Sequence, residues 1–178
     1  MYVWINFNML KITKGHVVSL SYVLRQENEV GPIIQETNSE NPLVFLFGFG
    51  QMLPDFEKNI EGKSIGETYS FGILAENAYG LYDPEGIMDL PIEIFFEEGK
   101  LVEDFIIPGK TIRLSDDEGN IHMAVVKGRS INTVQVDFNH PLAGKNLHFS
   151  VKILSVREAS PDELAHGHVH GPGGVDHH

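Results

Sequence analysis

Apolar and polar residues alternate along residues 147–156, and this period of two most strongly constrains the fold of the chain. Side chains two positions apart project from the same face of a strand, so the pattern predicts a half-buried strand. Four further segments rich in Val, Ile, Leu and aromatic residues favour strands, at residues 17–26, 33–37, 42–47 and 68–73. Between them, Pro54 as the first helical residue, a body of residues 55–60 and Gly62 as a stop predict a one-turn helix. The expected fold class is α+β, mostly β, in which an antiparallel sheet wraps one short helix.

Residues 82–137 differ from their surroundings in charge and in pattern. They carry 12 Asp and Glu against 5 Lys and Arg, a net charge of −7. Strand-like segments at 110–115, 121–126 and 133–136 predict a small β meander, with Gly119 supplying a turn. The segment before it holds more apolar side chains than such a meander needs: Ile92, Ile94, Phe95, Phe96, Leu101, Val102, Phe105, Ile106 and Ile107. We interpret 82–137 as a small β-rich domain, inserted in a loop of a first domain comprising 9–81 and 138–158, with surplus apolar surface for binding.

The third part, residues 159–178, begins with a helix signal and ends in a tract rich in Gly and His. Ser160 and Glu163 form a capping-box signature around Pro161, which predicts a short helix to about Ala165. The residues after it cannot form a core, and we expect them to be disordered unless they bind something.

Three histidines in this tract, His166, His168 and His170, alternate with other residues. In an extended backbone, alternate side chains lie on one side. Imidazoles converging in this way suit Ni²⁺, Zn²⁺ or Cu²⁺, of which we expect Ni²⁺ or Zn²⁺. The sequence therefore predicts a divalent metal site in the tail.

Composition excludes several classes of function. The net charge is −12 and the pI is about 5.1, which argues against binding to nucleic acid or to anionic membranes. The chain has no cysteine, so disulfides, thiolate zinc sites and cysteine nucleophiles are excluded. We recognise neither a secretory signal nor an apolar run of spanning length, and we expect a cytoplasmic protein.

Four stretches together resemble one family: GHVVSLSYVLRQ, PLVFLFGFGQMLPDFEKNIEGKSIGE, ENAYGLYDPE, and DFNHPLAGKNLHFSVKILSVREASPDELAHGHVHG. The resemblance is to FKBP-type peptidyl-prolyl isomerases (rotamases), in particular their bacterial SlyD-like branch, and covers residues 9–170. It implies an FKBP sheet with a helix, an inserted flap domain with chaperone function, and a metal-binding His tail. The expected activity is cis–trans isomerisation of X-Pro bonds in unfolded or partly folded polypeptides, with no cofactor for catalysis.

The resemblance also implies which residues form the site. The residues expected to be catalytic are Tyr79, Tyr22, Phe149, Phe45 and Gln35. Those expected to bind substrate are Ile34, Leu43, Met52, Leu53 and Phe56. Relatives carry Asp where this chain has Gln35, and a neutral amide cannot polarise Tyr22 as a carboxylate does. The alternative interpretation is therefore a catalytically weak chaperone, or a protein that binds and delivers nickel.

Overall fold

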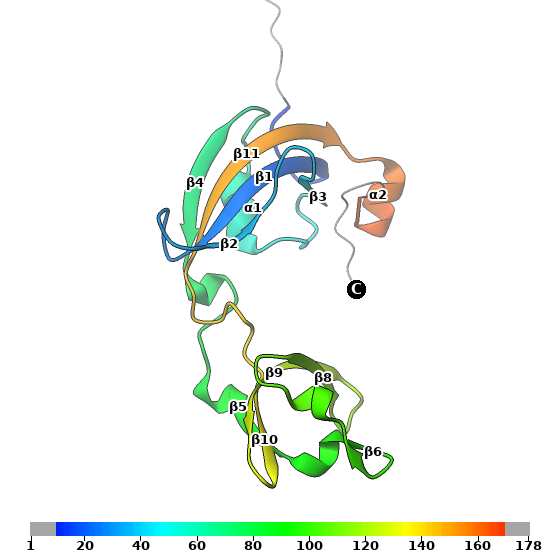
Figure 1. The fold of residues 1–178 in the computed structure, drawn as a ribbon. Coiled ribbons are helices and arrows are strands. Elements are labelled where there is room, and N and C mark those ends of the chain that lie inside the picture. Colours follow the sequence, from blue (N-terminus) through cyan, green and yellow to red (C-terminus); the bar gives the residue numbers. More distant parts are fainter. Residues whose placement is uncertain (1–9, 170–178) are drawn as a thin grey trace, which may run out of the picture. The chain divides into compact units, whose positions relative to one another are not determined.

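In the computed structural model, which describes residues 10–169, two long antiparallel strands form the centre of the first sheet (Figure 1). β1 (His16–Gln26) pairs with β11 (Leu147–Glu158) along its whole length. β2 (Ile33–Glu36) and β3 (Leu43–Leu46) pair with β1, and β4 (Thr68–Ile73) pairs with β11, all antiparallel. The alternating pattern of β11 is borne out, because Leu147, Phe149, Val151 and Ile153 are all buried.

Helix α1 (Pro54–Ile60) lies against one face of this sheet (Figure 1). Pro54 occupies its first turn, where the missing N–H costs no helical hydrogen bond, and Gly62 follows with φ +75°. Phe56 and Ile60 are completely buried. The predicted sheet wrapping a short helix is confirmed, and the helix begins at Pro54, its expected first residue.

The described residues form two compact units, one of residues 10–80 and 144–169 and the other of Leu81–Ala143. The second unit extends beyond the predicted boundary at 137 because residues 138 and 139 are tied into it. The Phe138 amide donates to the Gly86 carbonyl at 2.9 Å, and Asn139 exchanges hydrogen bonds with Asp83. The chain crosses between the units at Gly80 and Gly144, where the Gly144 amide donates to the Gly80 carbonyl at 2.8 Å.

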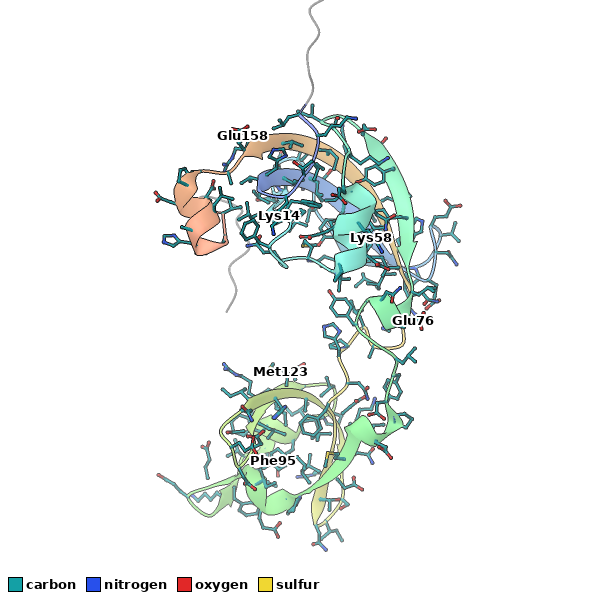
Figure 2. All side chains as sticks on the ribbon, turned by 180° about the vertical axis from the view of Figure 1, so that it is seen from behind. Lys14, Lys58, Glu76, Phe95, Met123 and Glu158 are labelled. Atoms are coloured by element: carbon teal, nitrogen blue, oxygen red, sulfur yellow. The ribbon has the colours of Figure 1, made fainter. Side chains whose placement is uncertain are left out.

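The second unit contains a four-stranded antiparallel sheet in the order β5-β10-β9-β8. Its strands are β5 (Ile87–Pro91), β8 (Thr111–Ser115), β9 (Ile121–Arg129) and β10 (Thr133–Asp137), and β6 (Phe96–Glu97) pairs with β7 (Lys100–Leu101). The meander matches the predicted one, and β5 adds a strand that was not predicted. The unit has its own core of Phe95, Ile106, Ile112, Ala124, Val126, Val134 and Val136, of which Phe95 is labelled in Figure 2.

Short 3₁₀ helices connect these strands. They are η1 (Ala75–Asn77) in the first unit, and η2 (Pro84–Gly86), η3 (Ile92–Phe95) and η4 (Glu103–Ile106) in the second. No helix within residues 10–169 is long and apolar enough to cross a membrane.

Helix α2 (Pro161–His166) follows β11 and carries the predicted capping box between Ser160 and Glu163. Gly167 ends it in the left-handed conformation, with φ +72°. The expectation of disorder after Ala165 is wrong for residues 166–169, because Val169 is buried against Val17 and Leu46. The remaining tail, including His170, lies outside the described residues.

Candidate active site

A cavity of about 350 Å³ opens in the first unit beside the N-terminal end of α1. It is lined by Tyr22, Leu24, Gln35, Gly50, Gln51, Met52, Leu53, Pro54, Phe56, Tyr79 and Phe149. The lining combines aromatic rings with few polar groups, and no group within it is a nucleophile paired with a base. Such a site favours binding and desolvation over covalent chemistry.

Packed aromatic rings form the inner part of the cavity. The Phe149 and Phe56 ring centroids lie 5.0 Å apart in an edge-to-face arrangement, and Phe149 stacks on Phe71 at 5.6 Å. The Tyr22 ring, on the neighbouring strand β1, lies 5.9 Å from the Phe149 ring between centroids. These rings come from three strands of the sheet, β1, β4 and β11, and from α1, which together fix their positions. Rings held in this way form a rigid apolar surface.

Two tyrosines supply the hydroxyl groups of the site. Burial, followed by the nearby Tyr79, raises the pKa of Tyr22 above its ordinary value, so its hydroxyl stays protonated and can donate a hydrogen bond. Tyr79 is 39% exposed and follows η1, where the Gly80 amide donates to the Ala75 carbonyl. Asn146 supports this turn by accepting from the Ala75 amide at 2.9 Å. Tyr79 is therefore at the rim of the cavity, while Tyr22 lies deeper.

Seven of the ten residues expected at the site line the cavity, namely Tyr22, Gln35, Met52, Leu53, Phe56, Tyr79 and Phe149. Gln35 faces it from β2, opposite Leu24 of β1 in the strand register. Its neighbour Ile34 is not part of the lining, because successive side chains of a strand project to opposite faces.

Two other expected residues also lie outside the lining, Leu43 and Phe45. Phe45, which was expected to be catalytic, does not line the cavity, since it is completely buried behind Phe56, with the two rings edge to face at 6.3 Å. Phe45 is thus a core residue that supports the floor of the cavity.

The structure adds four lining residues that were not predicted: Leu24, Gly50, Gln51 and Pro54. Leu24 could have been found from the period of two, since it lies two positions after Tyr22 on β1. The other three belong to the loop and helix start that also contain Met52 and Leu53. The one sequence signal for Gly50, Gln51 and Pro54 was that they adjoin Met52 and Leu53, which were expected at the site.

The two described histidines of the tail, His166 and His168, lie on either side of the turn at Gly167. Their rings stack with centroids 5.7 Å apart. The expected extended spacing is wrong for this pair, since His166 belongs to α2 and Gly167 is left-handed. Among residues 10–169, no three His, Asp or Glu side chains are grouped so that they could hold a metal ion.

The family model for FKBP-type peptidyl-prolyl cis-trans isomerases matches residues 10–154. The chain therefore belongs to the FKBP-type peptidyl-prolyl cis-trans isomerase family, and it is an isomerase whose substrates are proline-containing polypeptides.

Within this family the chain is similar to proteins named FKBP-type peptidyl-prolyl cis-trans isomerase SlyD. It is 39% identical to that of Aeromonas hydrophila over 94% of this chain and 75% of the relative. It is 35% identical to that of Escherichia coli strain K12, over 91% of this chain and 79% of the relative. For Haemophilus influenzae the identity is 33%, over 91% and 81% of the two chains.

Proposed function

We propose that the cavity in the first unit holds the prolyl residue of the substrate during isomerisation. Rotation about an X-Pro bond has a barrier of about 20 kcal/mol and requires neither a nucleophile nor a proton transfer. The planar amide is polar through resonance, and the twisted transition state loses that charge separation. A water-poor aromatic pocket therefore stabilises the transition state relative to the ground state.

The geometry of the cavity supports a role for each group. Phe56 lines the cavity and would supply the floor on which the pyrrolidine ring rests, and Phe149 and Tyr22 would supply the walls. The Tyr79 hydroxyl, at the exposed rim, would donate a hydrogen bond to a substrate carbonyl. The observation that carries the proposal is this convergence of packed rings and tyrosine hydroxyls in one cavity.

Replacing Gln35 with Asp should raise kcat/KM on a proline tetrapeptide by about fivefold. A carboxylate at this position would polarise the Tyr22 hydroxyl, and a charged acceptor strengthens a hydrogen bond by roughly 1 kcal/mol. Gln35→Asn is the matched control, because it has the shape of Asp without the charge. The measurement is X-Pro isomerisation of a tetrapeptide and of a slowly refolding protein. Equal rates for both variants would show that a carboxylate is dispensable here. Activity of the unaltered chain on neither substrate would favour the weak-chaperone alternative.

We also propose that the second unit captures unfolded polypeptides. Of its surplus apolar residues, Ile94, Phe96, Phe105 and Ile107 are exposed, whereas Phe95 and Ile106 form the core. Ile94 and Phe105 line a hollow of about 370 Å³ together with Ile112 and Leu114. Exposed apolar surface of this kind commonly binds other chains. Its clients would be cytoplasmic polypeptides, with basic segments favoured by the net charge of −7 over residues 82–137.

Joining a capture surface to an isomerase site in one chain has a defined advantage. A polypeptide held by the second unit encounters the cavity as an intramolecular partner, at high effective concentration. A weakly selective cavity can then act on many X-Pro bonds.

We propose, third, that the tail binds a divalent metal ion, Ni²⁺ or Zn²⁺. The paired imidazoles of His166 and His168 are suitable donors, and His170 would complete the set. Substituting all three by Ala should abolish binding of about one Ni²⁺ per chain in titration calorimetry, whereas His122→Ala in the second unit should not. A metal-bound imidazole must be neutral, so binding should weaken in acid. Unchanged nickel uptake by the triple variant would contradict this assignment.

A further inference from the structure

The C-terminal segment, residues 160–169, is fixed to the first unit at several points. Glu163 is 3% exposed and receives a bidentate ion pair from Arg157, at 2.7 and 2.8 Å. Glu163 also closes the capping box at Ser160, so α2 is held at its start. At its far end, Val169 is 7% exposed and packs against Val17 and Leu46. The segment therefore has a defined position next to β1 and β3.

Gln51 connects this segment to the wall of the cavity. Its Oε1 accepts a hydrogen bond from the Leu46 amide, and its Nε2 donates to the Gly167 carbonyl, both at 2.8 Å. An amide side chain can do both at once, because its oxygen accepts and its nitrogen donates. Gln51 itself lines the cavity, and it lies between Gly50 and Met52, which also line it.

The rest of the loop has supports of a different kind. The Gly48 amide donates to Glu57 of α1 at 3.3 Å, and the Lys14 ammonium lies 5.7 Å from the centre of the Phe49 ring. Both contacts hold the beginning of the loop, at residues 48 and 49. The bonds of Gln51 hold the following part, which forms the cavity wall.

We infer that Gln51 is a positioning residue, which ties the cavity wall at residues 50–53 to the docked C-terminal segment. With the cavity as the isomerase site, as proposed above, the segment thereby takes part in isomerase activity although it does not line the cavity. Loss of either end of the tie should let Met52 and Leu53 move and should lower transition-state stabilisation.

Two substitutions in the full chain test the two ends of this connection one at a time, Gln51 in the cavity wall and Val169 in the C-terminal segment. Gln51→Glu keeps an acceptor for the Leu46 amide but cannot donate to the Gly167 carbonyl. Val169→Lys places a charge in a buried site and should displace residues 167–169. Val30→Lys is the matched control, because Val30 is 85% exposed. Val169→Ala replaces Val169→Lys if the latter is unfolded at the assay temperature, as judged by circular dichroism.

We expect Gln51→Glu and Val169→Lys each to lower kcat/KM on a proline tetrapeptide by about fivefold, the effect of one net hydrogen bond. The double variant should lose no more than either single variant, because both break the same tie. Val169→Lys should also shift the amide resonances of Met52 and Leu53 and speed hydrogen exchange at Leu46, with Val30→Lys showing none of these changes.

Two results would overturn the inference. One is a Val169→Lys variant whose Met52 and Leu53 resonances and kcat/KM equal those of Val30→Lys. The other is a double variant in which the two losses multiply, since that would show that Gln51 and the segment act independently.

Discussion

A chain in which a short loop replaces Leu81–Ala143 should catalyse refolding of a protein about 100-fold less well, with tetrapeptide turnover nearly unchanged. The refolding loss follows from losing the proposed capture surface, since an intramolecular second binding site commonly changes apparent affinity by about 10²-fold or more. Tetrapeptide turnover should survive because the cavity is lined entirely from the first unit. The replacement is feasible because a 2.8 Å hydrogen bond already joins Gly80 and Gly144.

The matched control for this replacement keeps the second unit and alters only its exposed apolar side chains. Ile94→Ser, Phe105→Ser and Ile107→Ser in one chain should spare the core of the unit, since all three residues are exposed. This variant should lose refolding catalysis as the replacement does. If the replacement lowered tetrapeptide turnover as much as refolding catalysis, the second unit would be a structural part of the cavity and the proposed division of roles would be wrong.

The Phe149→Ala variant should lose about 3–5 kcal/mol of unfolding free energy in the first unit, together with most of its isomerase activity. Phe149 is buried among Phe56, Phe71 and Tyr22, so its removal leaves a cavity in the core and takes away one wall of the site. Denaturant unfolding and tetrapeptide turnover measure the two effects. Suppression of aggregation should persist, because the core of the second unit contains no residue of the first.

Phe149→Leu tests whether isomerase activity falls because the cavity loses an aromatic wall or because the first unit unfolds. Leu fills part of the volume, so this variant should remain folded at the assay temperature while the flat aromatic surface is lost. We expect its isomerase activity to fall without loss of aggregation suppression. Full isomerase activity in folded Phe149→Leu would show that the ring is not a wall of the site.

Local patterns in the sequence predicted most of the first unit. The period of two found β11, Pro54 and Gly62 framed α1, and Ser160 with Glu163 marked α2. The segment before β8 was not resolved in this way. Its apolar residues follow no single period, because it folds as β5, two 3₁₀ helices, and a hairpin whose strands β6 and β7 are two residues each. Elements this short leave no periodic signal.

The site was predictable where a motif supplied it and not where tertiary packing decided it. Tyr79 and Phe149 lie within recognisable stretches, and both line the cavity. Phe45 belongs to such a stretch as well, but its burial under Phe56 depends on how β3 packs against α1. Gln51 and Gly167 lie 116 residues apart in the chain, and no local pattern links them.

The position of β11 has a consequence for synthesis of the protein on the ribosome. In the sheet order β2-β1-β11-β4, β11 lies between β1 and β4, yet it follows all the other strands of this sheet along the chain. The sheet of the first unit therefore cannot form completely until β11 has been synthesised, although β1, β3 and α1 have emerged long before. The second unit is continuous and emerges earlier, and domains generally fold as units during synthesis. In each nascent chain, the second unit should thus be complete before the first unit can fold.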